Sequence, residues 1–313
     1  MWSGTKEDLE SCESEQPGDS SHDLCLECVF SYSAGQRGYT KCRGLPSSAA
    51  PRWTVRPYIM WGYRESTTFR ECLLTLFQCH NETGNIWTHL IGLVLFASLF
   101  VRDFVLSDQD WHHRLVTGAY LTASMLCMGS SAAFHLLGPV SRRAYDAALR
   151  CDVTGIAAVI AASFFVGLHY GYWCHPELGR IYLAIVGVLS LIGLAWPHVP
   201  ILFHNFNLSV AFFACFVAFA LVPLLHWVHI VGGLHSEQAE LFFYKLLATF
   251  CLYAAGFVFY STQFPERALG PRFDLVGHSH QIWHLGVLAG AAEFYVALRA
   301  YVAYRTAHAC AAQ

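Results

Sequence analysis

The sequence predicts an all-α membrane protein with seven transmembrane helices, a short interfacial helix before the first of them, and a cytoplasmic amino terminus. Two observations carry the fold class. Only 13% of the 313 residues are charged, about half the fraction usual in soluble domains. The charges are densest before residue 85, and beyond it long apolar runs alternate with short polar breaks. This pattern indicates a polar tail attached to a membrane domain.

The charge balance also excludes one class of partner. A formal net charge of −3 with only three Lys provides no extended basic surface, so a nucleic-acid partner has no electrostatic support. The 12 Cys are scattered rather than placed at the spacings of a disulfide scaffold.

Residues 1–57 are predicted to form a polar cytoplasmic tail, because they contain no apolar stretch long enough for a signal-peptide core. Few branched or aromatic side chains are present to offset the entropy of ordering, so a disordered tail with reduced thiols is favoured. The alternative is a four-thiolate zinc knuckle, because Cys25 and Cys28 form a C-x-x-C pair flanked by Cys12 and Cys42.

An interfacial helix is predicted over residues 66–80. Thr68 and Glu71 have the spacing of a capping box. Fifteen residues span about 22 Å, which is too short to cross a bilayer but suits a helix lying along its surface. Apolar residues follow at helical spacing: Phe69, Leu73, Leu76 and Phe77.

The membrane domain is predicted over residues 58–305, followed by a short luminal or extracellular tail over 306–313. Each apolar segment in it is about 20 residues long, enough to span a bilayer. Trp196, Pro197 and Pro200 interrupt the fourth segment near its end. The seven segments are 86–106, 115–138, 153–173, 180–200, 206–231, 240–260 and 281–302.

The distribution of Arg predicts the orientation, since basic residues favour the cytoplasmic side. Nine lie on the side of the tail: Arg52, Arg56, Arg64, Arg70, Arg142, Arg143, Arg150, Arg267 and Arg272. Five lie on the opposite side: Arg102, Arg114, Arg180, Arg299 and Arg305. This orientation is inverted relative to G-protein-coupled receptors, whose D-R-Y and N-P-x-x-Y patterns are also missing. A retinal protein is disfavoured because the seventh segment has no Lys for a Schiff base.

Polar residues inside apolar spans are costly unless they are paired or functional. Near the end of the second span, Ser131 and His135 lie four residues apart on one helix face. Asp152 opens the third span, and His280 and His284 lie one turn apart at the start of the seventh. The end of an even-numbered span and the start of an odd-numbered span share a side of the membrane, so these groups are expected to converge.

Three neutral imidazoles, from His135, His280 and His284, are the ligand set of an open catalytic zinc site with water in the fourth position. Asp152 is expected to hold that water or to orient an imidazole, and Ser131 to hydrogen-bond one turn away. Two alternatives stay open. The His residues could simply hydrogen-bond neighbouring helices, or His135 and one His of the seventh span could hold a haem, which leaves the other His without a role.

Longer motifs carry a resemblance to a known family. They are Gly62-Tyr63-Arg64, Asn81-Glu82-Thr83-Gly84-Asn85-Ile86-Trp87-Thr88-His89, Ser131-x-x-x-His135, Asp152-x-x-Gly155, Pro265-Glu266-Arg267 and Ser279-His280-Gln281-Ile282-Trp283-His284. Over residues 57–300 the chain resembles the progestin and adipoQ receptor family.

The resemblance implies seven helices, a cytoplasmic amino terminus and a zinc ion near the cytoplasmic face. By motif position it implies His135, His280 and His284 as the zinc ligands, with Asp152 near the zinc-bound water. Gly270-Pro271 departs from the Pro-Gly order expected there, which alters the loop between spans six and seven but touches no ligand.

Two functions follow from the resemblance. The first is a signalling receptor that acts as a zinc hydrolase of a lipid amide such as ceramide, in which zinc activates water and polarises the carbonyl while Asp152 serves as base. The second is a non-enzymatic Golgi tether that sequesters Raf kinase, a cytoplasmic signalling protein, and lowers MAP kinase signalling. The stretch from Leu225-His226-Trp227 to Gly232-Gly233 and the motif Gln281-Ile282-Trp283-His284 look most like the Golgi-resident, Raf-tethering branch. A Golgi location is therefore favoured, with the plasma membrane as the alternative.

The Arg distribution generates a topology prediction. A reporter fused after Gln313 should be luminal or extracellular, and one fused before Met1 should be cytosolic, as measured by protease protection of intact vesicles. The sequons at Asn81 and Asn207 should carry no glycan, because both fall on the predicted cytoplasmic side. A glycan at either position would reverse the orientation.

Overall fold

A computed structural model describes residues 44–308 and Cys310. Within this part the regular secondary structure is helical, apart from an isolated bridge between Leu45 and Tyr63. The four cysteines of the possible zinc knuckle lie outside the described residues.

The seven predicted spans are confirmed. The described residues contain seven stretches of helix long and apolar enough to cross a membrane: Thr83–Val105, Trp111–Leu137, Arg142–Gly171, Pro176–His198, Phe206–Ile230, Glu237–Phe273 and Ser279–Ala307. They are built from α3 (Thr83–Phe100) with a π-helical turn to Val105, α4 (Trp111–Leu137), α5 (Arg142–Gly171), α6 (Pro176–Ala195), α8 (Phe206–Ala218) with α9 (Leu221–Ile230), α10 (Glu237–Thr262) and α12 (Ser279–Ala307).

Short elements join these helices at the ends of the bundle. As expected from its proline residues, the fourth span leaves α-helical geometry at Trp196–His198. The remaining elements are the 3-10 turn Arg52–Thr54, α2 (Phe69–Leu74), the 3-10 turn Thr75–Phe77, α7 (Pro200–Phe203), α11 (Glu266–Leu269) and the 3-10 turn Gly270–Phe273.

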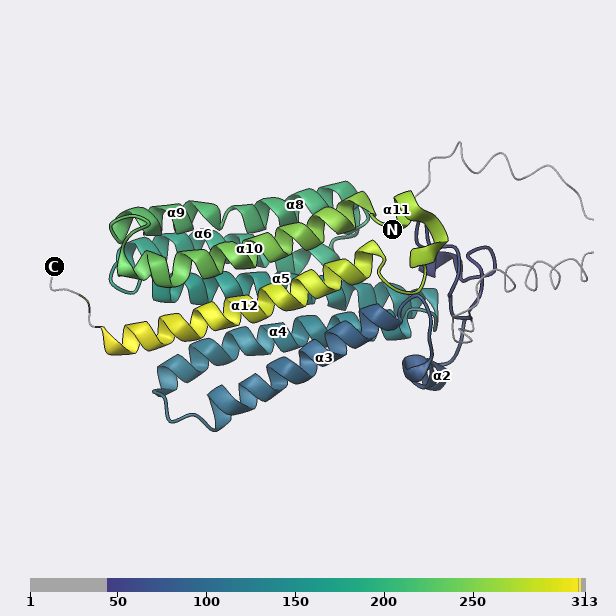
Figure 1. Ribbon diagram of the computed structural model, residues 1–313, viewed down its shortest axis with the longest axis horizontal. Helices are drawn as coiled ribbons and strands as arrows, with labels where there is room; N and C mark the ends of the chain where they lie inside the picture. The colour runs from purple at the N-terminus through teal and green to yellow at the C-terminus, as the bar shows by residue number, and fades with distance from the viewer. Residues whose placement is uncertain (1–43, 309, 311–313) are drawn as a thin grey trace, which may run out of the picture. The chain divides into compact units, whose positions relative to one another are not determined.

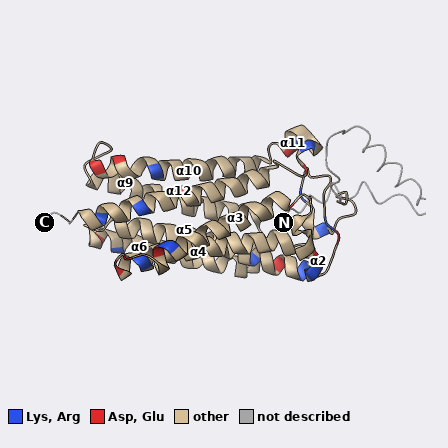
Figure 2. Ribbon diagram, turned by 60° about the horizontal axis from the view of Figure 1, so that its bottom comes forward, with Lys and Arg blue, Asp and Glu red and all other residues tan. Residues whose placement is uncertain are grey.

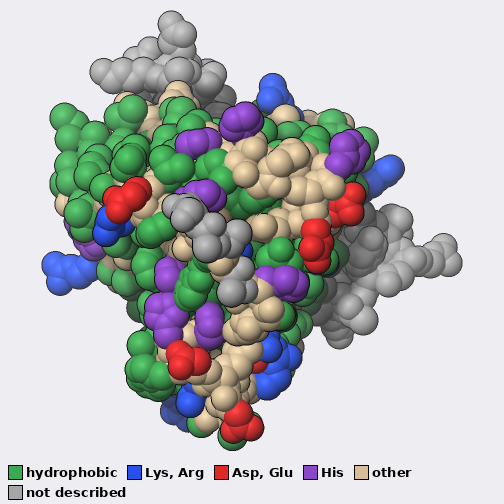
Figure 3. Space-filling view, turned by 90° about the vertical axis from the view of Figure 1, so that its left-hand side faces the viewer, with side chains coloured by type: hydrophobic (Ala, Val, Ile, Leu, Met, Phe, Trp, Pro, Cys, Tyr) green, Lys and Arg blue, Asp and Glu red, His purple; other side chains and the backbone are tan. Residues whose placement is uncertain are grey.

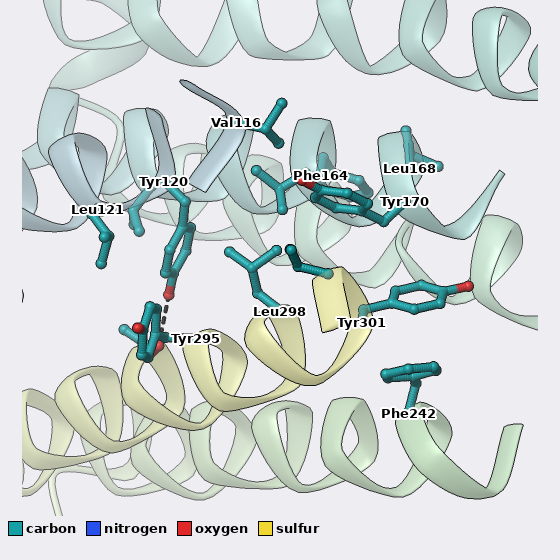
Figure 4. Close-up of a cluster of buried hydrophobic side chains, with 14 of the residues drawn as sticks. Val116, Tyr120, Leu121, Phe164, Leu168, Tyr170, Phe242, Tyr295, Leu298 and Tyr301 are labelled. Atoms are coloured by element: carbon teal, nitrogen blue, oxygen red, sulfur yellow. Dashed lines mark hydrogen bonds between the residues drawn. The ribbon is translucent and has the colours of Figure 1, made fainter. Parts of the chain in front are cut away.

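Helix α12 lies at the centre of the bundle, against α10, α3, α4 and α5 (Figure 1). Its contact with α10 is close because Gly286 faces Gly256, and a Cβ atom on Gly286 would lie only 3.1 Å from the Gly256 Cα atom. On the other side, the buried Tyr120 of α4 reaches α12 and donates a hydrogen bond to the carbonyl of Ala291 (Figure 4). These contacts fix the position of α12 relative to its neighbours.

The third spanning helix differs from its predicted bounds. It begins at Arg142, where the Ser141 side chain caps it by accepting a hydrogen bond from the Ala144 N–H. Asp152 therefore lies inside α5 rather than opening it, which corrects the sequence prediction. The polar residues between Arg142 and Asp152 simply continue the helix beyond the apolar segment, a continuation that an apolar run alone does not reveal.

The predicted interfacial helix is present but short. The capping box is confirmed, because the Thr68 hydroxyl accepts from the Glu71 N–H while the Glu71 carboxylate accepts from the Thr68 N–H. The α-helix ends at Leu74 and a 3-10 turn continues to Phe77. Its apolar side chains are exposed, with Phe69 at 58% and Phe77 at 82%, as expected for a helix at a membrane surface.

The residues before the first span pack against the bundle from Gly44 onward, and they belong to the same compact unit. Trp53 donates its indole N–H to the carbonyl of Gly138, and the buried Asp274 carboxylate accepts from the backbone N–H groups of Met60 and Trp61. Residues from 44 onward are thus held against the helix ends by hydrogen bonds between distant parts of the chain.

Figure 2 shows most of the charged residues toward the two ends of the bundle, as expected for an apolar belt between aqueous phases. Asn81 is only 2% exposed. A glycan could not be attached to it in the folded protein, so Asn207, which is exposed, is the informative sequon for topology.

The end of the bundle that carries the carboxyl terminus displays several His side chains (Figure 3). Among the His residues near helix ends there, His112 and His169 face each other with their Nε2 atoms 2.9 Å apart. Cys174, after α5, forms a disulfide with Cys310 beyond α12. Disulfides persist in oxidising compartments, so this bond agrees with the predicted luminal or extracellular carboxyl terminus.

The disulfide generates the second prediction. Mass spectrometry of membranes digested without reduction should recover peptides containing Cys174 and Cys310 as one cross-linked species. Cys174→Ser should leave Cys310 as a thiol that reacts with maleimide before reduction, whereas Cys215→Ser, at an exposed free cysteine, should leave the cross-link intact. Recovery of both cysteines as free thiols from unreduced membranes would contradict the bond.

Candidate metal centre

Three histidines converge at the end of the bundle where α3 and α12 begin. His135 comes from the last turn of α4, and His280 and His284 from the first turns of α12. One ring nitrogen from each lies within 4.8 Å of the others, and the Nε2 atoms of His135 and His280 are 3.4 Å apart. His135 and His284 are each only 2% exposed. The predicted convergence of these three side chains is confirmed.

The hydrogen bonds around the rings fix two of the tautomers. His135 Nδ1 lies 2.8 Å from Glu82 Oε2, and an ionised carboxylate can only accept. His284 Nδ1 lies 3.1 Å from the backbone carbonyl oxygen of Asn85, which also only accepts. The proton therefore sits on Nδ1 in both rings, and each Nε2 keeps a free lone pair.

This arrangement fits a bound metal ion. The Nε2 lone pairs of His135 and His284 point into the three-His group, and a cation bound there would be held by these two nitrogens together with a ring nitrogen of His280. Three His nitrogens with one remaining position are the donor set of open zinc sites. Each ligand is on a packed helix, so the donor atoms are held in place by the fold.

Asp152 and Ser131 lie near His135. The Ser131 hydroxyl is hydrogen-bonded to the Asp152 carboxyl group, and the same carboxyl group interacts electrostatically with His135. Ser131 is 2% exposed. The structure thus brings together all five residues singled out in the sequence, with Asp152 near the three-His group but outside it.

Several residues of the site were missed by reasoning from the spans. Glu82 accepts from His135, Asn85 accepts from His284, and the His89 ring stacks on His284 with 3.8 Å between centroids. All three belong to the motif from Asn81 to His89. Glu82 and Asn85 precede the first predicted span, which begins at residue 86, whereas His89 lies inside that span but was not singled out from the sequence.

Glu82 and Arg56 form a buried ion pair next to His135. Glu82 Oε1 accepts from Arg56 Nε at 2.9 Å. Burial by itself would raise the pKa of Glu82, but the Arg56 guanidinium and then His135 outweigh it and hold the pKa well below its usual value. The carboxylate therefore stays ionised at neutral pH.

His80 stabilises the backbone just before α3, and it does so as a neutral ring. Burial and the nearby Arg64 lower the pKa of His80 to about 3. Its Nδ1 atom is therefore free to accept the backbone N–H of Glu82, at 3.1 Å. The start of α3 is fixed by a group that does not change charge near neutral pH.

A small pocket lies between the amino-terminal segment (residues 44–64) and His135. Its volume of about 20 Å³ suffices for roughly one water molecule. Its lining includes both the metal-centre residue His135 and its partner Glu82, together with Arg56, Arg64 and Tyr145. A water molecule, but not an acyl chain, fits this pocket.

The fold and site define a class: a seven-helix membrane protein with a group of three His that could hold a metal ion at one end of the bundle. Comparison with known proteins identifies the family. A family model described as haemolysin-III related matches residues 77–295, which include every residue of the centre. The chain belongs to this haemolysin-III-related family, which includes the progestin and adipoQ receptors.

Individual relatives agree with this assignment. The chain is 31% identical over 265 residues to the adiponectin receptor protein of Drosophila melanogaster, covering 82% of this chain and 59% of that protein. It is 32% identical over 253 residues to the progestin and adipoQ receptor-like protein 1 of Caenorhabditis elegans, covering 77% and 57%. It is 28% identical over 239 residues to the progestin and adipoQ receptor family member 3 of Homo sapiens, covering 73% and 76%. The chain thus spans less than two thirds of the fly and worm proteins, and these identities do not separate one branch of the family from another.

The centre generates the third prediction. Metal analysis of detergent-purified protein should find about one zinc ion per chain. Replacing both His280 and His284 by Ala should abolish binding, because a single imidazole from His135 remains. His226→Ala is the matched control, since this His bonds Tyr182 away from the centre. If the double variant retained stoichiometric zinc, the assignment of His280 and His284 as zinc ligands would be wrong.

Proposed function

We propose that this protein is a receptor-like signalling protein of the membrane whose zinc centre hydrolyses a lipid amide such as ceramide. The observation that carries the proposal is the Asp152 carboxyl group, which interacts with His135 but is not one of the three-His group. A carboxyl group in that position is free to exchange protons with a water molecule at the open position. A purely structural zinc site has no use for an open position.

Each residue has a distinct task in this proposal. His135, His280 and His284 would hold zinc, which when bound lowers the pKa of water and polarises a carbonyl oxygen. Asp152 accepts the proton from the attacking water and returns it to the leaving amine. Ser131 holds the Asp152 carboxyl group in orientation through its hydrogen bond.

The position of the centre supports a lipid substrate. The ligands come from the first turns of α12 and the last turn of α4, both of which are spanning helices. In this proposal the amide of a membrane lipid would approach the centre from the bilayer, because the pocket on the side of the amino-terminal segment holds only about one water molecule. The proposed signalling role follows from relatives that are named as receptors, and the proposed location is the Golgi membrane, with the plasma membrane as the alternative.

The alternative function is a non-enzymatic Golgi tether in which the same zinc is structural and the cytoplasmic side sequesters Raf kinase. It rests on the resemblance of residues 281–284 to that branch of the family. The exposed apolar side chains of α2 and the following turn would hold the cytoplasmic side at the membrane surface, as such a tether requires. The two functions differ in whether Asp152 matters once zinc is bound.

The fourth prediction separates the two functions. Asp152→Ala should lower zinc affinity only about 10- to 100-fold, because the residue lies beside the ligands and is not one of them. In protein fully loaded with zinc, ceramide hydrolysis should fall by a further factor of about 10² to 10⁴, the contribution of a general base. Zinc content and turnover are measured on the same preparation.

Wild-type protein is the positive control for this measurement, and His284→Ala protein is the negative control. Unchanged turnover in zinc-loaded Asp152→Ala protein would exclude the residue as the base. An absence of turnover in zinc-loaded wild-type protein would contradict the hydrolase and favour the tether.

A further inference from the structure

We propose that Glu82 is a positioning residue of the metal centre, whose carboxylate sets the tautomer and orientation of His135 and links the centre to the amino-terminal segment through Arg56. This inference rests on the proposed zinc centre and adds a residue to it. Glu82 does not contact the reacting atoms in the proposal, and it acts through His135.

The carboxylate of Glu82 is fully engaged. Oε2 accepts from His135 Nδ1 at 2.8 Å and from the Asn85 side-chain amide at 2.5 Å, and Oε1 accepts from Arg56 Nε at 2.9 Å. Glu82 itself is only 9% exposed. Three donors around one buried carboxylate leave it little freedom to rotate.

The backbone that carries Glu82 is equally constrained. Glu82 immediately precedes α3. Its N–H donates to the His80 ring, and the neighbouring Asn81 N–H donates to the Gly62 carbonyl at 2.9 Å. On the other side, the His278 ring and the Asn81 carbonyl oxygen lie 3.0 Å apart, which ties this corner to the start of α12. The carboxylate is therefore anchored to the same helix ends that carry the metal ligands.

The chemical consequence is specific to His135. A ring that donates from Nδ1 to a carboxylate must present Nε2 as a lone pair, and the negative charge makes that nitrogen a stronger donor to a cation. His280, by contrast, has no hydrogen-bond partner at Nδ1. His135 is thus the ligand held by a carboxylate, and the loss of this bond should weaken metal binding about 10- to 100-fold.

A purely structural role of Glu82 makes a different prediction, and the chain offers a matched control. Asp274 is also a buried carboxylate at this end of the bundle, and it also holds the amino-terminal segment, by accepting from Met60 and Trp61. Both of these donors are backbone N–H groups, and no His of residues 44–308 bonds to the Asp274 carboxylate. Replacing either carboxylate by its amide should weaken the attachment of the segment, but only the change at Glu82 should alter the metal centre.

The experiment uses full-length protein purified in detergent and stripped of metal by a chelator. Zinc affinity is measured by competition with a chromophoric chelator for wild type, Glu82→Gln, Glu82→Leu, Arg56→Gln and Asp274→Asn. We expect Glu82→Gln to bind zinc about 10-fold more weakly and Glu82→Leu about 100-fold, with Asp274→Asn within about 3-fold of wild type. Arg56→Gln should lose less than Glu82→Leu, because the bond from His135 to Glu82 survives.

A second readout guards against unfolding of a variant. The visible absorption of the cobalt-substituted protein reports the geometry of the ligands, and it should shift in Glu82→Gln but not in Asp274→Asn. Wild-type affinity and an unshifted spectrum in Glu82→Gln would overturn the inference while leaving the zinc centre standing. Equal losses in Asp274→Asn and Glu82→Gln would also overturn it, because the effect would then be structural. Failure of wild-type protein to bind zinc would remove the centre itself and the inference with it.

Discussion

The hydrogen bond between Glu82 and His135 joins the parts of this molecule that matter for its site. A buried carboxylate is costly in an apolar bundle unless donors surround it. Here one donor comes from the amino-terminal segment, one from the first turn of α3 and one from the last turn of α4. This group of polar side chains around Glu82 forms where these three parts of the chain meet. It is also where α12 begins, so the two histidines of α12 face the one from α4.

Helix α12 completes the centre because its position is determined by packing along its whole length. Gly286 allows it to approach α10 at backbone distance, Tyr120 bonds its carbonyl from α4, and a cluster of buried aromatic side chains surrounds its second half. Native packing at this density leaves little room for a helix to slide. A site built on such elements holds its ligand atoms more rigidly than a site on loops. The opposite end is fastened separately, by the disulfide between Cys174 and Cys310.

The fold and the three-His group could be predicted from local signals. The residues that hold these histidines through hydrogen bonds could not. Length and apolarity define a spanning helix by themselves, and the spacing of His280 and His284 places both on one helix face. The role of Glu82 was not predicted, because it depends on His135, which is 53 positions away in the sequence. Its only local signal was the motif around it. Asp152 was correctly placed near the ligands but wrongly placed at the start of its helix, since polar residues can extend a helix beyond the membrane. The hydrogen bonds that hold residues 53–61 to the helix ends and the disulfide were likewise not predictable, because both depend on contacts between residues far apart in the chain.

The central claim is that three imidazoles of the membrane domain, held by their hydrogen bonds, form a zinc centre with one open position. X-ray absorption at the zinc edge of the purified full-length protein tests it most directly. The account predicts about three imidazole nitrogens and one oxygen at roughly 2.0–2.1 Å, with no sulfur in the coordination sphere. A shell of sulfur ligands at about 2.3 Å would contradict it. The metal would then belong to the cysteines near the amino terminus, and the three histidines would be hydrogen-bonding groups between helices.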